Sequence, residues 1–333
     1  MKLARLTTEN IRGLPDRAHV FTDRTGAPLD TVLVTGAPGS GKTTLLEAIG
    51  AVKEAIGSYG GPQSPARQRR TGATRARIEV VWALSPAERA SAELESSELA
   101  ATWGIGDGDS RVACDPRARR LFTAYSHAPE QGKFEYLPAS RRLDGPRSRA
   151  GGSAPSVAAE ARLRLADDPE KYAGLRRHLG DLTRAQAGQI MKVIDTQGIA
   201  MRAQVPDALA AYKHAIAQLL PELRLVAVEP DERSARVQFQ KREGAIVELA
   251  ELSESERQAV LFATTFCRLG LNHSVVLIDS PELHVHPSRH ADFFAGLCGL
   301  GRDNQIIAAT TSPELLSTVR PEQVIDLGSR PLA

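Results

Sequence analysis

With 333 residues, of which 42% are hydrophobic, the chain is long enough for one large domain or two modest ones with a substantial core. Its 42 basic and 40 acidic residues leave a net charge of +2, so the global charge gives no sign of nucleic-acid binding. Three widely separated cysteines argue against a disulfide framework and against a cysteine-based zinc site. There is no signal-like apolar run and no stretch of about 18 apolar residues, so we expect a cytoplasmic protein without a membrane span.

The first expected elements are two strands followed by a helix. Lys2–Thr8 is an expected strand, and a turn separates it from a second strand at Val32–Thr35. The second strand is β-branched and apolar, which is typical of a buried parallel strand. A glycine-rich turn follows, and then a helix whose apolar residues recur at helical spacing at Leu45, Leu46, Ile49, Val52 and Ile56.

The pattern of the next part of the chain is less regular. Gly57–Ala73 is rich in Gly, Pro, Gln and Arg, which predicts an exposed loop. Arg77–Ala83 is an expected strand, and Ser85–Glu88 has the form of a capping box with proline at the first helical position. Leu121–Ser126 and Lys133–Leu137 are predicted to form an antiparallel pair of strands.

A linker and a helical segment are expected in the middle of the chain. Gly145–Ser156 has the composition of a flexible linker, and Ala158–Leu220 has a helical pattern without strand signals. Strands return after Pro221, where Val226–Val228 and Arg236–Gln240 are expected to pair in antiparallel fashion. We therefore predict an N-terminal part of one nucleotide-binding domain at 1–145, a linker and helical lobe at 146–222, and the C-terminal part at 223–333.

The last part of the chain alternates helices and buried strands. The expected helices are Ser253–Leu269 and Ser288–Leu297, and the expected strands are Val275–Ile278 and Ile306–Ala309. An α/β pattern at both ends predicts a single nucleotide-binding fold that the helical lobe interrupts.

Residues 36–43 read Gly-Ala-Pro-Gly-Ser-Gly-Lys-Thr and match the P-loop pattern G-x-x-x-x-G-K-[ST] in full. The glycines allow backbone N–H groups to surround phosphates, Lys42 would reach the β- and γ-phosphates, and the Thr43 hydroxyl would bind Mg²⁺. A buried strand before the loop and an amphipathic helix after it favour this interpretation over a simple glycine-rich turn. The residues expected to contact ATP here are Gly36, Pro38, Gly39, Ser40, Gly41, Lys42, Thr43 and Thr44.

The strand at Val275–Ile278 ends in a carboxylate, Asp279. This is the Walker B form, in which the aspartate binds Mg²⁺ through water. The alternative is an ordinary buried strand that ends in Asp, and the upstream P-loop makes this the weaker interpretation. Thr43 and Asp279 are thus the expected magnesium site.

Five segments resemble those of small ABC-type ATPases, the group that contains the OLD, RecF and SMC proteins. Asp279–Pro287 is similar to D-E-P-E-L-H-L-H-P, and Glu9–Gly13 to the opening N-F-R-G segment. Glu251–Arg257 resembles the signature L-S-x-G-E directly before a helix, and Ala309–Glu314 resembles the switch segment T-H-S-P-E. Tyr136–Arg141 resembles the segment that joins the strand layer to the helical lobe.

The resemblance implies an α/β P-loop NTPase of the ABC-ATPase type, with a mixed sheet, an antiparallel β layer and a helical lobe. It also implies an ATP-gated homodimer in which each ATP lies between the P-loop of one protomer and the signature of the other. Ser253 and Ser255 would contact the partner's nucleotide, and Arg12 would contact the nucleotide of its own chain. From the residues alone, an N-cap and first helical turn that bind no ligand is the favoured interpretation of the signature segment, and the other motifs make it the weaker one.

Three departures from the family pattern concern hydrolysis. Ser280 stands where the family has the glutamate that activates water, Ser255 where it has the signature glycine, and Thr311 where it has the switch histidine. Glu282 is the nearest carboxylate along the chain, but it follows Pro281. The catalytic residues to weigh are therefore Asp279, Ser280, Glu282 and Thr311, and we predict that ATP binding survives while hydrolysis is slow.

Two further clusters carry weaker hypotheses. A metal could bind among His284, His286 and His290, although the family pattern already accounts for two of these as an interface loop. Nucleic acid could bind a run of basic residues, which is more often a solvated loop; the run consists of Arg67, Arg69, Arg70, Arg75 and Arg77.

The leading functional hypothesis is an ATP-gated homodimer that controls a separate effector protein in phage defence or DNA repair. The alternative is a non-hydrolysing, nucleotide-dependent interaction module, which Ser280 and Thr311 favour. A small-molecule kinase with a P-loop is a third and weaker hypothesis, because a kinase needs neither the signature-like segment nor the loop after Asp279.

Overall fold

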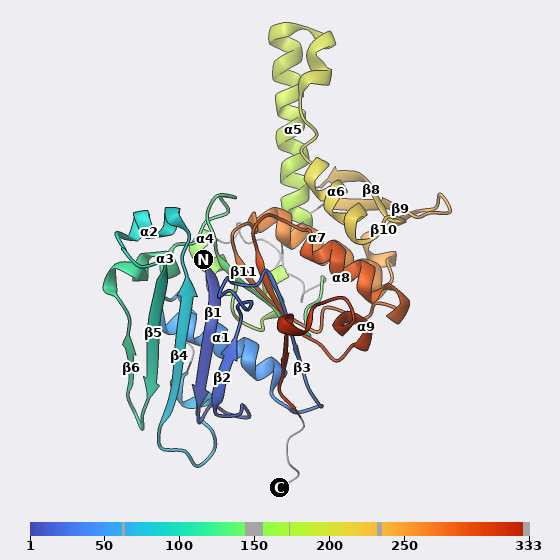
Figure 1. Ribbon diagram of the computed structural model, residues 1–333. Coiled ribbons are helices and arrows are strands. Elements are labelled where there is room, and N and C mark those ends of the chain that lie inside the picture. Colours follow the sequence, from blue (N-terminus) through green and yellow to red (C-terminus); the bar gives the residue numbers. More distant parts are fainter. Residues whose placement is uncertain (62–63, 144–155, 173, 232–234, 329–333) are drawn as a thin grey trace.

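The computed structural model describes residues 1–333 except 62–63, 144–155, 173, 232–234 and 329–333 (Figure 1). Two sheets lie on opposite sides of the helix α1 (Lys42–Ile56), and a helical part with a third, small sheet lies beyond the second of them. The first sheet is antiparallel with the order β2-β1-β4-β5-β6. Its strands are β1 (Lys2–Glu9), β2 (Arg17–Val20), β4 (Ala76–Ala83), β5 (Glu98–Ile105) and β6 (Ser110–Ala113).

The second sheet is parallel and is built from both ends of the chain, in the order β13-β3-β12-β11-β7. All its strand pairs are parallel, so the carboxyl ends of its strands meet at one edge, where P-loop folds bind ligands. Its strands are β3 (Thr31–Thr35), β7 (Phe134–Leu137), β11 (Val275–Asp279), β12 (Gln305–Ala309) and β13 (Val324–Asp326).

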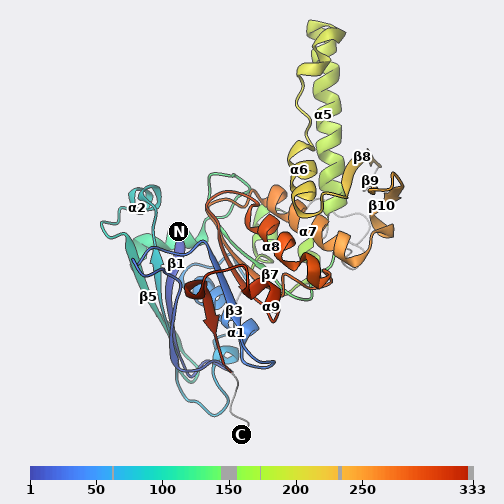
Figure 2. The same cartoon turned by 45° about the vertical axis from the view of Figure 1, so that its right-hand side comes forward.

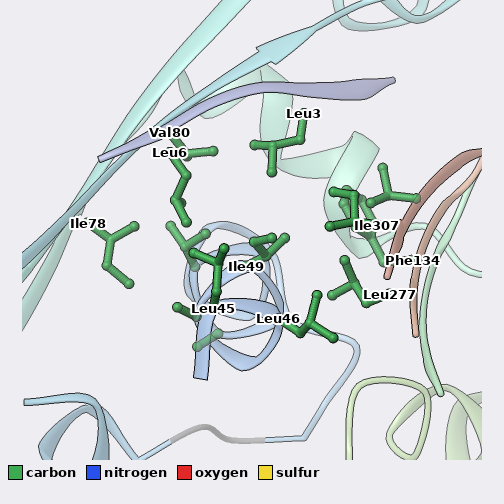
Figure 3. Close-up of a cluster of buried hydrophobic side chains, with 14 of the residues drawn as sticks. Leu3, Leu6, Leu45, Leu46, Ile49, Ile78, Val80, Phe134, Leu277 and Ile307 are labelled. Atoms are coloured by element: carbon green, nitrogen blue, oxygen red, sulfur yellow. The ribbon is translucent and has the colours of Figure 1, made fainter. Parts of the chain in front are cut away.

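The helix α1 fills the space between the two sheets. Figure 3 shows Leu45 and Ile49 of α1 beside Leu6 and Val80 of the antiparallel sheet, while Leu46 lies toward the parallel sheet. Alternate residues of β11 and β12 enter this core, and the residues between them enter a second core on the other face of the parallel sheet. This two-sided burial explains why β11 and β12 are continuous apolar runs.

The second core is covered by helices and by the sheet β10-β9-β8. The helices α6 (Ala210–Leu219), α7 (Glu254–Leu269) and α8 (His290–Cys298) contribute to this core. The strands of the small sheet are β8 (Arg224–Pro230), β9 (Ala235–Gln240) and β10 (Ile246–Glu248). The remaining short helices are α2 (Pro86–Ala92), α3 (Arg119–Thr123), α4 (Val157–Ala161) and α9 (Pro313–Leu316).

The helix α5 (Leu175–Gln197) projects from this helical part as an arm (Figures 1 and 2). Its first turns are packed, because Leu175 and Leu179 are buried in the second core. The outer part of the arm, with Met191, is exposed, as are Ile199 and Met201 in the 3₁₀ turn Ile199–Gln204 that follows it. The arm corresponds to the helical lobe expected from the sequence, although the position of domain boundaries stays a prediction.

Most of the expected elements are confirmed, and one pair is wrong. Residues Leu121–Ser126 do not form a strand, because Asp115 caps a short 3₁₀ turn at Pro116–Ala118 that leads directly into α3. The segment Lys133–Leu137 does contain a strand, β7, but it pairs in parallel with β11. The periodicity of a short apolar run does not distinguish a strand that pairs in parallel from one that pairs in antiparallel fashion. The sequence pattern therefore could not give the pairing of Lys133–Leu137.

Two expected loops have different outcomes. Gly57–Ala73 is only partly exposed, since Gln68 is buried and the backbone of Arg69 forms an isolated antiparallel β-bridge with Ile11. The expected linker Gly145–Ser156 lies outside the described residues except for Ser156, which is the N-cap of α4. In the part of the chain that the structure describes, no helix combines the length and hydropathy needed to span a membrane.

Candidate nucleotide-binding site

The P-loop connects the end of β3 to the start of α1 and has a backbone that requires glycine. Gly36, Gly39 and Gly41 have φ angles of 141°, 77° and 101°, which side chains rarely adopt. A Cβ atom at Gly39 would meet nothing within 4 Å among the described residues, so the loop is open on that side. A Cβ atom at Gly41 would lie 3.1 Å from the carbonyl oxygen of Gly13. The loop is thus a cradle open at Gly39 and closed at Gly41.

Lys42 lies across this loop. Its Nζ donates hydrogen bonds to the carbonyl oxygens of Gly36 and Ala37, at 2.8 and 3.1 Å. An ammonium group that bonds the carbonyls of two successive residues at the start of the glycine loop is held against that loop. The arrangement fits a phosphate group, which would exchange these neutral acceptors for charged ones.

The expected magnesium ligands are in direct contact. Thr43 Oγ1 donates a 2.7 Å hydrogen bond to Asp279 Oδ2 at the carboxyl end of β11. Burial raises the pKa of the Asp279 carboxyl above its usual value, and the hydrogen bond from Thr43 opposes this shift. A hydroxyl and a buried carboxylate at this separation fit a small divalent cation that keeps most of its water ligands. When bound, Mg²⁺ would neutralise charge on the β- and γ-phosphates.

The opening segment of the chain packs directly against the P-loop. Gly13 approaches Gly41, and the Arg12 guanidinium forms an ion pair with Glu47 of α1. The sequence predicted a nucleotide contact for Arg12, whereas the structure pairs it with Glu47; the nucleotide contact stays a prediction.

Sequence reasoning missed the residue that holds this segment in place, which is Arg70. Its guanidinium donates to the carbonyl oxygens of Arg12 and Leu14, at 3.3 and 2.7 Å, and forms a 2.7 Å ion pair with Asp16. The backbone N–H of Arg70 also donates to the carbonyl oxygen of Asn10. The only signal in the sequence was the excess of arginine in the 57–77 loop, which the sequence interpretation assigned to solvent or nucleic acid.

Glu282 is brought to the carboxyl ends of β11 and β12. Its Oε1 accepts hydrogen bonds from the Thr310 hydroxyl at 2.8 Å and from the Thr311 backbone N–H at 3.2 Å. Its Oε2 is buried and has no hydrogen-bond partner among the described residues. A buried carboxylate oxygen without a donor requires one from water or a ligand, and the role of Glu282 in catalysis stays a prediction.

Ser280 has a strained backbone and a weak contact with the neighbouring carboxylate. Its φ angle is 51°, in the left-handed region, and its hydroxyl lies 3.4 Å from Asp279 Oδ1. The base in contact with this hydroxyl among the described residues is the Asp279 carboxylate, which is also the expected magnesium ligand. The side chain therefore offers no replacement for the carboxylate that the family has at this position.

The signature-like segment begins α7. Ser253 is the N-cap, and it forms a reciprocal capping box with Glu256, whose Oε2 accepts from both the N–H and the hydroxyl of Ser253. This is the geometry of the ligand-free alternative, and it leaves a nucleotide contact in a dimer untested. In the portion of the chain described here, no hydrogen bond joins Ser253 or Ser255 to the P-loop of the same chain.

The two weaker hypotheses lose support from the contacts observed. His290 is committed to structure, since its Nδ1 lies 2.8 Å from Ser312 Oγ and its Nε2 2.9 Å from the Val285 carbonyl oxygen. No group of three or more His, Cys, Asp or Glu side chains that could hold a metal ion occurs among the described residues. In the basic loop, Arg69 is paired with Asp107 and Arg70 with Asp16, so neither forms part of a free cationic strip.

The fold and the site together define a P-loop protein of the AAA ATPase class with the fold of an SMC head domain. Over 98% of its length the chain superposes on the SMC head domain from Thermotoga maritima, with 94% of that chain covered, a TM-score of 0.54 and 13% identity. An SMC head bound to the C-winged helix domain of ScpA gives the same coverages and TM-score at 14% identity. The SMC head with an extended coiled coil bound to the C-terminal domain of ScpA, derived from Pyrococcus furiosus, gives 98% and 93% coverage, a TM-score of 0.55 and 12% identity.

Residues 32–317 match the family described as "AAA domain, putative AbiEii toxin, Type IV TA system", and the chain belongs to this family. No curated protein matches the sequence significantly. Membership of a P-loop ATPase family implies nucleotide binding, usually together with Mg²⁺.

Proposed function

We propose that the chain is an ABC-type ATPase that binds Mg²⁺-ATP, forms an ATP-gated homodimer, hydrolyses ATP slowly and controls a separate protein effector in phage defence or DNA repair. The observation that carries nucleotide binding is the 2.7 Å contact between Thr43 Oγ1 and Asp279 Oδ2 beside the open glycine cradle. Within this site Lys42 binds phosphate, Thr43 and Asp279 hold the cation, and Glu282 and Thr311 lie at the adjoining strand ends.

The homodimer is supported by the position of α7. A helix of 16 residues begins after Ser253 with the positive end of its dipole, and such an end attracts the γ-phosphate of a second protomer's ATP. Because the Ser253 hydroxyl is engaged with Glu256, contact with a phosphate requires that this hydroxyl rotate away from the carboxylate. The capping box thus opposes the closed dimer until a phosphate replaces its hydrogen bond.

A separate effector is supported by the family description, which names a putative AbiEii toxin and a Type IV TA system. Two of the similar SMC heads were solved with a ScpA domain bound, which is a property of those proteins. For this chain, the identity of the partner and the pathway are part of the proposal.

A non-hydrolysing interaction module is the second candidate. Ser280 favours it, because a hydroxyl whose contact with a base, among the described residues, is with the expected magnesium ligand Asp279 does not orient and activate water as a carboxylate does. The two candidates share ATP binding and differ in turnover, so release of inorganic phosphate separates them.

ATP should convert the protein to a dimer more completely than ADP does. Sedimentation velocity without nucleotide, with ADP and with ATP measures this directly. Ser253→Ala should weaken the ATP-dependent dimer, because it removes the N-cap at the proposed phosphate contact. Ser85→Ala is the matched control, since Ser85 forms the same capping box with Glu88 on α2, and each loss should cost about 1 kcal/mol of stability. Equal dimerisation of the two variants, or a wild type that stays monomeric with ATP, would contradict the sandwich.

If the basic loop binds nucleic acid, the logarithm of the binding constant should fall linearly with the logarithm of the salt concentration. Arg67 gives the clean test because it is exposed and forms no ion pair in the described structure, unlike Arg69 and Arg70. Arg67→Ala should reduce the salt slope by about 1, the effect of one lost phosphate contact. Lys192→Ala, which removes an exposed charge on the α5 arm, should leave the slope unchanged. Absence of binding at low salt would refute the hypothesis.

A further inference from the structure

Arg141 is a buried arginine whose guanidinium donates four hydrogen bonds, and it is only 3% exposed. It lies just after β7. Its Nη1 donates to the carbonyl oxygens of Asp279 and Pro138, at 2.6 and 3.0 Å. Its Nη2 donates to the carbonyl oxygen of Ser280 at 2.7 Å, and its Nε donates to Gln258 Oε1 at 2.7 Å. One side chain therefore joins the β7 loop, the turn after β11 and the helix α7.

Two of these acceptors belong to the turn that orients the Asp279 side chain. Ser280 lies in this turn with a φ of 51°, an unfavourable conformation for a residue other than glycine. Its N–H is fixed by the carbonyl oxygen of Ala309 at 2.9 Å, and its carbonyl oxygen is fixed by Arg141. With the carbonyl groups of two successive residues held, the direction in which the Asp279 carboxylate points toward Thr43 depends on the guanidinium.

The remaining contacts lie on one face of α7. Gln258 is 2% exposed, and Phe262 lies one helical turn further along the same face. The guanidinium carbon of Arg141 is 4.8 Å from the centre of the Phe262 ring, a stacking arrangement that suits the planar guanidinium. Gln258 immediately follows the segment Glu251–Arg257, so Arg141 holds α7 close to the end that is proposed to meet the partner's nucleotide.

The chemistry of arginine explains why this residue type occupies the position. Its planar fork supplies several donors in fixed directions, whereas a lysine ammonium is a single point on a flexible stem. Burial lowers the pKa of Arg141 to about 10, while the neighbouring Tyr172, Asp279 and Glu282 favour the charged form, so the group stays charged at neutral pH.

We propose that Arg141 is a positioning residue that couples the two nucleotide-contacting regions of one chain, by fixing the turn at Asp279–Ser280 and the start of α7 in a single arrangement. This inference rests on the proposed ATP-dependent dimer. Magnesium-assisted ATP binding at the P-loop is thereby linked to the surface with which the same chain engages its partner.

The first test compares Arg141→Met with Arg164→Met. Arg164 is a matched control, since it is also about 2% exposed and pairs with Glu135 and with backbone carbonyls away from the P-loop. Calorimetry should show that the affinity of Arg141→Met for ATP without Mg²⁺ is within about twofold of wild type. The increase in ATP affinity that Mg²⁺ produces should be about tenfold smaller than in wild type, as expected for the loss of hydrogen bonds to a charged group. Sedimentation should show weaker ATP-dependent dimers. Arg164→Met should melt at a lower temperature and keep both properties.

The second test uses a milder variant, in case Arg141→Met does not fold. Gln258→Met removes only the acceptor on α7 and leaves the three carbonyl contacts of Arg141 intact. It should bind Mg²⁺-ATP within about twofold of wild type and dimerise about tenfold more weakly, as expected for the loss of one hydrogen bond to a charged group. Dimerisation equal to wild type in this variant, or an Arg141→Met variant that matches Arg164→Met, would overturn the coupling and leave the proposed function standing. A wild type that does not dimerise with ATP would overturn the proposed function and the coupling with it.

Discussion

Replacement of Lys42 by alanine should lower the affinity for ATP by about 10- to 100-fold. Lys42 is the fixed positive charge within the P-loop, and its Nζ already lies over the carbonyl oxygens of Gly36 and Ala37, where a phosphate would bind. A hydrogen bond to a charged group contributes about 1.5–3 kcal/mol, which corresponds to this range of affinity. Isothermal titration calorimetry with ATP and Mg²⁺ measures the loss.

Thr43→Ala distinguishes the contribution of Mg²⁺ to ATP affinity from that of the direct phosphate contacts. This variant should bind ATP without Mg²⁺ as the wild type does and should lose most of the gain from Mg²⁺, because Thr43 Oγ1 is the hydroxyl beside Asp279. Thermal melting without nucleotide checks that both variants are folded. Equal ATP affinity of wild type and Lys42→Ala would remove the P-loop assignment.

Ser280→Glu should raise the rate of ATP hydrolysis by about 10²-fold, the lower end of the contribution of a general base. The wild-type turnover should be slow, since in-line attack requires an acceptor that orients the water, and the Ser280 hydroxyl has only a 3.4 Å contact with Asp279. The substitution adds little backbone strain, because serine and glutamate are both non-glycine residues at a φ of 51°. Phosphate release under single-turnover conditions measures the rate.

Glu282→Gln should have a smaller effect than Ser280→Glu. Its Oε1 accepts bonds from Thr310 and Thr311, a role in which a glutamine carbonyl can substitute. The opposite result would follow if Glu282 were the catalytic base, because a base also needs a carboxylate oxygen without a hydrogen-bond partner, as Oε2 is among the described residues. Brisk hydrolysis by wild type that Glu282→Gln abolishes would identify Glu282 as the catalytic carboxylate and refute the prediction of a weakened site.

The parts of the fold that could be predicted from the sequence are those with a contiguous pattern. The strand β11 is a continuous apolar run buried on both faces, and α1 begins at Lys42 directly after the glycine loop. The strands β5 and β6 were not predicted, and Glu98–Ile105 shows why, because small residues occupy many of its positions and contrast weakly with polar ones. Tertiary pairing with β4 decides such a segment.

In the candidate site too, the residues that could be predicted are those that belong to a contiguous sequence pattern. Thr43 and Asp279 could be predicted because each follows a recognisable strand, and the parallel sheet brings their ends together. Arg70 and Arg141 could not, since their acceptors are backbone carbonyls and side chains far along the chain, with Arg141 and Asp279 separated by 138 residues. A basic residue in a loop has the same appearance in sequence whether it faces water or holds a buried turn.

The α5 arm is anchored at its base in the second core and is exposed beyond it. Its 23 residues extend about 34 Å at roughly 1.5 Å per residue, and only its first turns, at Leu175 and Leu179, are buried. Rotation of the base by about 5° would move the tip by about 3 Å, from simple geometry of a rod of that length. Displacements too small to alter the packing around Leu179 are thereby magnified at Met191, so the exposed end is the place where small motions of the ATPase core reach their largest amplitude.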